Sequence, residues 1–478
     1  MRTLLALSLL LFTAKSFAKQ TPNIVYIYAD DQGWGEAQAY NPDLPIATPG
    51  IDRIASEGMR FADAHSASSV CTPSRYALLT GRYAWRTRLQ KAVVQTGQAP
   101  LIAENILTVP QLLKQHGYDT AIIGKWHLSF SYKNGKVTKQ KGEYNVGAAT
   151  IGAQVIGGPI TRGFDVYEGF HHAREMLTWI EQDVVTENFE SAVEMLPRLT
   201  ERSVAYIDGR REKSQTPFFL YVPLNSPHSP VLPAPEWKGK SGINDHADFV
   251  MQTDDAVKQI LDALDRNHFT ENTLVIFSTD NGTAPKPESL RKLGYDPLPG
   301  LKGNKMTIYE GGHRVPFVAR WPGVITPGSI CNDTIVQVSL MATVADMLEV
   351  SLPDDAGVDS FSILPLLQGK EAKAAPTHPL AIHHSFKGKF AIRKGNWKFI
   401  ADSEEKKGKK HTPAPAQLYN LAKDRGETNN LYETHPEKAQ ELLSLLEKSV
   451  ADGRTRPGPP MQNDVEVDIW KLRTPKKK

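Results

Sequence analysis

The chain has 478 residues and a formal net charge of +3, and 40% of its residues are hydrophobic and 23% charged. This composition is ordinary for a folded globular enzyme and argues against a largely disordered chain. The small positive charge, much of it in the C-terminal run RTPKKK, gives no indication of a nucleic acid partner. With only two cysteines, Cys71 and Cys331, a disulfide framework is excluded.

The first 18 residues are predicted to be a secretory signal peptide. Arg2 precedes a short apolar run from Leu4 to Phe12, and the small residues Ser16 and Ala18 follow, as before a cleavage site. A buried first helix is the alternative interpretation. No later segment is apolar enough for a transmembrane helix. We therefore expect a periplasmic or secreted protein with no membrane partner, in which stray thiols would be a liability.

Four segments open with an uninterrupted apolar run and end abruptly in charged or imidazole side chains. They are NIVYIYADD (23–31), DTAIIGKWH (119–127), PFFLYVPLNSPH (217–228) and NTLVIFSTDNG (272–282). Such runs are typical of strands that are buried on both faces of a parallel sheet. Helical patterns alternate with them, over residues 48–58, 108–117 and 248–264. The alternation predicts an α/β fold with a large, mostly parallel central sheet flanked by helices.

A second, smaller α+β domain is predicted beyond a boundary near residues 370–379. FAIRKGNWKFIA reads as two short strands about a turn at residues 394–396, LYNLAKDRG adds a third, and residues 436–450 carry leucines at helical spacing. The expected organisation is a signal peptide (1–18), a catalytic domain (19–375), a small domain with a short antiparallel sheet (376–455) and a Pro-rich, basic tail (456–478). Segments 132–160 and 283–300 lack periodicity and are predicted to be loops over the site.

Polar side chains follow each of the four predicted strands. They are Asp30 and Asp31, Lys125 and His127, His228, and Asp280 and Asn281. Ligands of open α/β sheets bind beyond the carboxyl ends of the strands. Crowded carboxylates repel unless a cation neutralises them, and an all-oxygen donor set favours Ca²⁺ or Mg²⁺ over zinc. Taken singly these residues are as readily turn and capping residues, but as two pairs they predict a metal site.

The stretch VCTPSRYALLTG, residues 70–81, places Cys71 at the predicted opening turn of a helix. CTPSRYALLTG resembles the signature of type I sulfatases, the formylglycine-dependent, arylsulfatase-like enzymes of the alkaline phosphatase superfamily. Further blocks resemble the same family, in order across the chain: DDQGWG from Asp30, GKWH from Gly124, NSPH from Asn225, STDNG from Ser278, LKGNKMTIYEGGHRVP from Leu301 and LYNLAKDRGETNNL from Leu418. Several ordered blocks make the resemblance far more specific than one motif.

The resemblance implies an alkaline phosphatase-like fold and a formylglycine made from Cys71 by a formylglycine-generating enzyme. That group would attack sulfur and form a covalent sulfo-enzyme intermediate, and deprotonating its second hydroxyl would expel sulfate. The implied ligands of Ca²⁺, or of Mg²⁺ in its place, are Asp30, Asp31, Asp280, Asn281 and the modified Cys71.

The resemblance also assigns roles to the basic residues. Arg75 would lower the pKa of the attacking hydroxyl, His127 would be the base that releases sulfate, and His228 would protonate the leaving oxygen. Lys125 and Lys305 would bind sulfate oxygens. Lys302 is the alternative to Lys305, because LKGNKM departs from the more glycine-rich run of the family.

The expected substrate is a sulfated carbohydrate. Aromatic and basic residues in predicted rim loops suit an anionic sugar, although ordinary surface positions would explain them equally well. These residues are Trp85, Arg86, Arg88, His171, His172 and Arg174. Two alternatives are a phosphonate monoester or phosphodiester hydrolase of the same superfamily and a catalytically silent protein that binds sulfated glycans. The silent protein predicts a gap in the constellation, and the sequence has none.

Overall fold

The structure is a computed structural model of the chain, and it describes residues 21–139, 146–370, 377–401 and 416–471. The predicted signal peptide, most of the predicted domain boundary and the end of the basic tail lie outside these ranges. Within them, no helix combines the length and the hydropathy needed to cross a membrane.

A twelve-stranded mixed sheet forms the body of the molecule. From edge to edge its strands are β15 (Ser329–Cys331), β2 (Met59–Phe61), β14 (Phe317–Arg320), β13 (Thr273–Thr279), β1 (Asn23–Asp30), β12 (Phe218–Pro227), β4 (Asp119–Lys125), β9 (Val166–Phe170), β10 (Thr178–Glu181), β11 (Val184–Asn188), β8 (Gln154–Ile156) and β5 (Ser131–Lys133). The central strands β13, β1, β12, β4 and β9 are parallel. They include the four predicted strands, which are adjacent, so their carboxyl ends share one edge.

The flanks of the sheet depart from the predicted parallel arrangement. Strand β14 pairs antiparallel with β13 and β2, and β10, β11, β8 and β5 continue antiparallel beyond β9. Segment 132–160, predicted to be a loop, contributes to β5 and β8 and also to β6 (Val137–Lys139) and β7 (Gly147–Ala149). Segment 283–300 contains the short helix α6 (Pro287–Arg291). Strands of three residues are too short to leave a periodic signal in the sequence.

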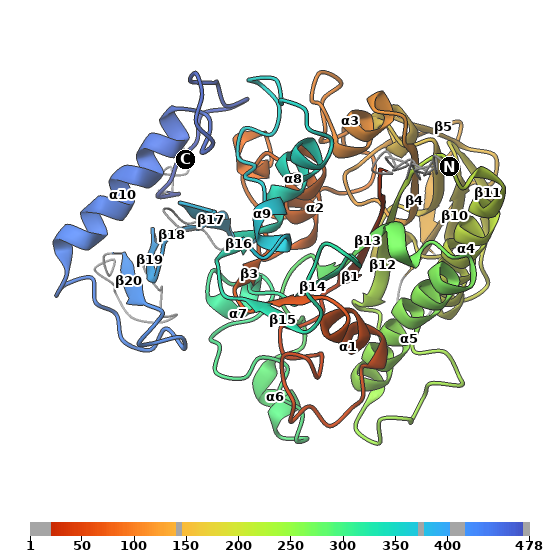
Figure 1. Ribbon diagram of the computed structural model, residues 1–478, viewed down its shortest axis with the longest axis horizontal. Coiled ribbons are helices and arrows are strands. Elements are labelled where there is room, and N and C mark those ends of the chain that lie inside the picture. The colour runs from red at the N-terminus through yellow and green to blue at the C-terminus, as the bar shows by residue number, and fades with distance from the viewer. Residues whose placement is uncertain (1–20, 140–145, 371–376, 402–415, 472–478) are drawn as a thin grey trace, which may run out of the picture.

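Helices cover both faces of the sheet (Figure 1). On one face, side chains of β1 such as Tyr26 and Tyr28 pack with α2 (Cys71–Thr80), α3 (Val109–Gln115) and α8 (Leu340–Met347). On the other face, Val25 and Ile27 pack with α1 (Pro49–Ser56), α4 (Met195–Gly209) and α5 (Asp245–Arg266). Because consecutive side chains of a strand point to opposite faces, one apolar strand builds two cores.

The C-terminal region forms a four-stranded antiparallel sheet of β17 (Ala381–His384), β18 (Phe390–Lys394), β19 (Trp397–Ile400) and β20 (Gln417–Asn420). Helix α10 (Pro436–Ala451) packs Leu442 and Leu446 against it. The same apolar cluster includes Ala77 and Trp85. The small sheet therefore shares its apolar core with α2 and with the residues that follow α2. Figure 1 shows β17 on the side of the small sheet that faces the large domain.

Candidate active site

The carboxyl edge of the central sheet brings the predicted site residues together. Asp30 ends β1, Lys125 ends β4, His228 directly follows β12, and Asp280 and Asn281 directly follow β13. Cys71 is the first residue of α2 and is 2% exposed. Ligand atoms of Asp30, Asp31, Cys71 and His228 all lie within 4.8 Å of one another.

Cys71 is a protonated thiol in this environment. Its Sγ lies 3.6 Å from Asp30 Oδ1. Burial, followed by the nearby charge of Asp280, raises the pKa of Cys71 well above its ordinary value. A thiol is a weak nucleophile compared with a thiolate. The unmodified side chain is therefore poorly suited to nucleophilic attack, although it is the group at the centre of the site.

The surroundings of Asp280 and Asp30 shift the pKa values of these two carboxyl groups in opposite directions. Arg75 donates to Asp280 Oδ2 from Nη2 at 2.7 Å and from Nε at 3.0 Å. Burial, reinforced by the charge of Asp30, still raises the pKa of Asp280 to about 7. Burial also acts to raise the pKa of Asp30, but the charge of Lys125 and other cations more than offsets it and lowers that pKa. The carboxylates of Asp30 and Asp280 carry like charges, so the ionised form of one disfavours the ionised form of the other.

The oxygen donors of this cluster fit a hard divalent cation. Asn281 donates from Nδ2 to Asp31 Oδ1 at 2.7 Å, and its amide oxygen is buried without a hydrogen-bond partner among the described residues. A buried unpaired amide oxygen is costly unless something binds it. Together with the carboxylates of Asp30, Asp31 and Asp280 it forms the oxygen-rich donor set that Ca²⁺ or Mg²⁺ prefers.

Lysine and histidine side chains line the opposite side of the cluster. Lys305 Nζ lies 2.6 Å from Asp31 Oδ1, Lys125 Nζ donates to Asp30 Oδ2, and His228 Nε2 lies 3.6 Å from Asp31 Oδ2. Burial, helped by the charge of Lys305, lowers the pKa of His228 to about 4. Lys302 instead lies over the ring of Tyr309 and donates to a backbone carbonyl. The structure therefore places Lys305, not Lys302, in the site.

His127 lies at the rim of this cluster in a left-handed backbone conformation with φ of +54°. Its backbone N–H donates to the carbonyl of His171, and its Nδ1 is buried without a hydrogen-bond partner. Burial, with the charge of Lys125, holds the pKa of His127 well below its ordinary value, so the imidazole is neutral. A neutral imidazole with a free nitrogen can accept a proton, as a general base must.

The prediction of rim residues was wrong for several positions. Trp85 and Arg86 are buried, and Arg86 stacks on Trp85 and donates to Asp359 in an ion pair of 2.8 Å. His171 and His172 are also buried rather than on an outer rim. Arg88 and Arg174 are exposed. A basic or aromatic residue in a loop gives no local signal of whether a distant carboxylate or core covers it.

The sequence predicted His171 and His172 only as rim residues, whereas the structure packs the pair beside His127. The ring of His172 lies 5.3 Å from that of His127, and both histidines approach Glu175. The pair directly follows the parallel strand β9, as Asp31 follows β1. Polar residues at the end of a strand were the available signal, but the strand VYEGF is too short and too polar to stand out.

Comparison with known proteins agrees with this geometry. The family model described as "Sulfatase" matches residues 22–350, and the one described as "N-sulphoglucosamine sulphohydrolase, C-terminal" matches residues 303–456. An N-acetylgalactosamine-6-O-sulfatase of Bacteroides thetaiotaomicron is 31% identical, over 90% of this chain and 93% of that protein. Arylsulfatase A of Homo sapiens is also 31% identical, over 92% and 89%.

A solved structure from work on the metabolism of multiple glycosaminoglycans by Bacteroides thetaiotaomicron superimposes with a TM-score of 0.77 at 27% identity. It covers 90% of this chain and 99% of the other. The matches run through both the large sheet and the small C-terminal sheet. The chain therefore belongs to the sulfatase family of sulfuric ester hydrolases.

Proposed function

We propose that this sulfatase is exported and removes sulfate from a sulfated carbohydrate after Cys71 is converted to formylglycine. The observation that carries the proposal is a buried cluster in which Cys71 lies beside Asp30 and Asp31, while Lys125 and Lys305 pair with these two carboxylates. The N-acetylgalactosamine-6-O-sulfatase among the relatives supports a sulfated amino sugar as the substrate. The apolar run at residues 4–12 supports export.

Conversion of Cys71 explains how a buried thiol becomes the nucleophile. A hydrated formylglycine supplies two hydroxyls on one carbon, one for attack on sulfur and one whose deprotonation lets sulfate leave. Arg75 lies one helical turn from Cys71 and keeps a positive charge at the base of the site, where it favours an ionised oxygen. A formylglycine-generating enzyme in the host is the required maturation partner.

The remaining side chains bind and orient the sulfate. A bound Ca²⁺ would withdraw charge from a sulfate oxygen, and its ligands would be Asp30, Asp31, Asp280 and Asn281. Lys125 and Lys305 lie where they can donate to other sulfate oxygens. His127, as a neutral imidazole, would be the base that accepts a proton, and its buried, unpartnered Nδ1 supports this role. His228 is the candidate to protonate the leaving alcohol, because it is the more exposed of the two imidazoles. Its pKa of about 4 would rise beside the negative charge of a bound sulfate ester, and this rise would let the ring hold the proton that it donates.

The test compares two esters and a set of sugars on matured enzyme. Mass spectrometry first measures the fraction of Cys71 converted to formylglycine. The converted enzyme is then assayed on an aryl sulfate, on an aryl phosphonate and on N-acetylgalactosamine sulfated at O4 or O6. We expect sulfate hydrolysis to exceed phosphonate hydrolysis, and sulfated sugars to be desulfated.

Cys71→Ser is the matched control, because serine has nearly the same shape but its single hydroxyl, if left unoxidised, has no second hydroxyl to expel sulfate. Mass spectrometry checks that the serine has not been oxidised to formylglycine. It should fold like the wild type and lose turnover. Faster hydrolysis of the aryl phosphonate would favour the phosphonate hydrolase alternative. Full activity in a preparation whose Cys71 is unmodified would contradict the proposed mechanism.

A further inference from the structure

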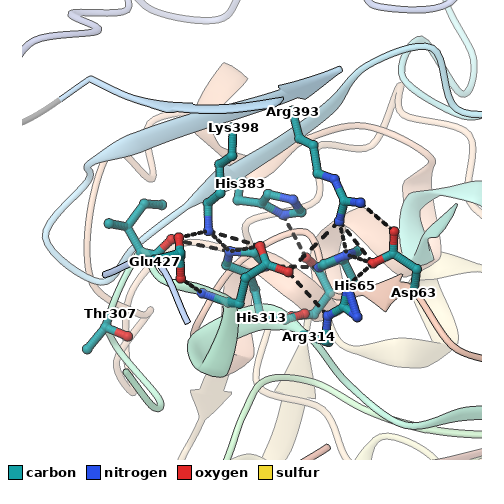
Figure 2. Close-up of polar contacts among 12 residues, drawn as sticks. Asp63, His65, Thr307, His313, Arg314, His383, Arg393, Lys398 and Glu427 are labelled. Atoms are coloured by element: carbon teal, nitrogen blue, oxygen red, sulfur yellow. Dashed lines mark hydrogen bonds and ion pairs between the residues drawn. The ribbon is translucent and has the colours of Figure 1, made fainter. Parts of the chain in front are cut away.

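A second group of buried ionisable side chains lies outside the site, between the large domain and the C-terminal sheet. It is called here the interdomain cluster, and Figure 2 shows its side chains pointing toward one another. Its members are Asp63, His65, Glu310, His313, Arg314, His383, Arg393, Lys398 and Glu427, all buried. None of them has a part in the proposed chemistry.

The charges of the interdomain cluster are paired across the domain boundary. Lys398, from β19 of the C-terminal sheet, lies 3.0 Å from Glu310 and 2.8 Å from Glu427. Glu427 also accepts the backbone N–H of Glu310 at 2.7 Å, at the start of α7 (Glu310–His313). Arg393, from β18, lies 2.6 Å from Asp63. The C-terminal side thus supplies two cations, Lys398 and Arg393, to acids of the large domain.

Three imidazoles fill the space between these ion pairs. The rings of His313 and His383 are stacked at 3.8 Å with 9° between their planes. His65 Nδ1 lies 3.0 Å from His313 Nδ1, and Lys398 Nζ lies 3.1 Å from His313 Nε2. Burial holds the pKa of His313 and of His383 well below its ordinary value, so both rings are neutral.

This arrangement favours a hydrogen-bonded network over a metal site. The lone pairs of an imidazole lie in the plane of its ring, so two stacked, nearly parallel rings cannot both direct one toward the same ion. Two ring nitrogens also face cations instead, one of His313 facing Lys398 and one of His65 facing Arg393 at 3.2 Å. The cluster is therefore a set of charges and polar rings whose ion pairs Lys398–Glu310 and Arg393–Asp63 form only when the two domains are in register.

The backbone leads from the interdomain cluster directly into the site. The carbonyl of His313 accepts the N–H of Ser66 at 2.8 Å, and the carbonyl of Ser69 accepts the N–H of Met306 at 2.8 Å. Residues 66–69 lead to Cys71, and Met306 follows Lys305. The carbonyl of His384, next to His383 on β17, accepts the N–H of Ser69 at 3.1 Å. The segments that carry Cys71 and Lys305 are thus bonded to each other and to elements that hold the cluster.

We propose that the interdomain cluster is a positioning device, through which Lys398 of the C-terminal sheet sets the relative places of Cys71 and Lys305. Lys398 does not reach the reacting atoms, so it is a positioning residue and not a catalytic one. The pairing of Lys398 with Glu310 and Glu427 fixes the start of α7, and α7 ends the loop that carries Lys305. A shift of about 1 Å in a reacting group can lower turnover on the order of 100-fold.

The test uses a charge-neutral double variant, Lys398→Met/Glu427→Gln, beside Lys398→Met alone. The single variant leaves two buried acids without their lysine and can fail to fold, whereas the double variant removes one acid with the base. Leu446→Ala is the matched control, because Leu446 is a buried apolar residue of the same C-terminal core and offers no polar side-chain atom to the ion pairs of the cluster. All variants are assayed well below their melting temperatures and normalised to the fraction of formylglycine.

We expect the double variant to lose at least about tenfold in kcat and to bind inorganic sulfate more weakly. Leu446→Ala should keep both values within about twofold at a similar loss of melting temperature. A crystal structure of the double variant should show Lys305 Nζ displaced from Asp31, now 2.6 Å away. A folded double variant with the kinetics of Leu446→Ala and an unmoved Lys305 would overturn the proposal, as would zinc bound by the three histidines.

The kinetic part of this inference rests on the proposed function, and the two can fail separately. A wild type that hydrolyses no sulfate ester would refute the proposed function. The displacement of Lys305 in the crystal structure needs no turnover, so it would still test the positioning role.

Discussion

Asp280 shows how one side chain of the site depends on all of its neighbours. It is fully buried, it pairs with Arg75, and burial and the charge of Asp30 raise its pKa to about 7. A carboxyl group with such a pKa gains from a divalent cation, which would stabilise its ionised form. Asp280 therefore differs from a carboxylate in an ordinary ion pair, because Arg75 alone does not keep it fully ionised and a bound divalent cation would.

Asp280→Asn tests this dependence. We expect kcat/KM to fall on the order of 100-fold, because the variant loses a ligand charge and the closer of the two carboxylates that pair with Arg75. Excess Ca²⁺ should restore part of the activity, as measured by titrating Ca²⁺ into metal-stripped enzyme. Asp254→Asn is the control, since Asp254 is also buried with a pKa raised by burial to about 7, but it accepts from the backbone of α1 at Gly50 and Ile51.

Asp254→Asn should lower stability and leave the dependence on Ca²⁺ unchanged. Near-normal activity of Asp280→Asn in metal-free buffer would show that the carboxylates of the site are turn residues only.

Helix α2 is the element that carries Cys71, and its far end is as constrained as its start. It ends at Gly81, which has φ of +64°, and the Gly81 N–H donates to the carbonyl of Ala77 at 2.9 Å. A Cβ added at Gly81 would meet Gly357 Cα and Met341 Cβ at 2.8 Å. The turn after α3 makes a natural comparison, because Gly117 has φ of +81° but a Cβ there would meet nothing within 4 Å.

Gly81→Ala and Gly117→Ala separate backbone strain from packing. Both substitutions put alanine into the left-handed region, which costs about 1 kcal/mol. Gly81→Ala should cost about 1–3 kcal/mol more, because the new methyl group overlaps backbone atoms in a packed interior. The free energies of unfolding in urea measure both. Equal losses for the two variants would mean that the end of α2 can shift freely.

The stability of the folded protein should depend on pH through its buried histidines. Burial lowers the pKa of His378 to about 4, and burial with the charge of Lys471 lowers the pKa of His384 to about 3. In the unfolded chain both histidines titrate near pH 6.5. Between that pH and the lower pKa of the folded state, the unfolded chain therefore binds protons that the folded protein does not bind. The folded protein is therefore most stable above about pH 6.5, and its free energy of unfolding decreases as the pH falls from there toward the pKa of each folded histidine.

Urea unfolding at pH 7.5 and 5.5 measures this loss, with a limit of about 1.4 kcal/mol per histidine and pH unit. His384→Gln should lose less stability between the two values than the wild type, since glutamine does not titrate. His268→Gln, at an exposed position, should leave the difference unchanged. A wild type that is equally stable at both values would contradict the assignment of neutral buried histidines.

Much of the fold and of the site could be predicted because the signals are local. The apolar runs of β1, β4, β12 and β13 identify strands that are buried on both faces, and the polar residues that end them mark one edge of the sheet. The motif around Cys71 and the order of the other blocks identify the family. The short strands β5 to β8 could not be predicted, because three residues are too few to show a periodic pattern. The burial of Arg86 and the packing of His172 on His127 could not be predicted either, since each depends on a partner that is distant along the chain.

Sequence alone determines which residues can carry the chemistry, because residue type and spacing along the chain are local properties. It left Lys302 and Lys305 as alternatives, and only the three-dimensional arrangement separates them, by placing one beside Asp31 and the other over Tyr309. It contained no sign of the interdomain cluster, whose members are contributed by segments more than 300 residues apart, such as Asp63 and Arg393. Pairing energies between such segments exist only after the chain has folded, so no local pattern can encode them.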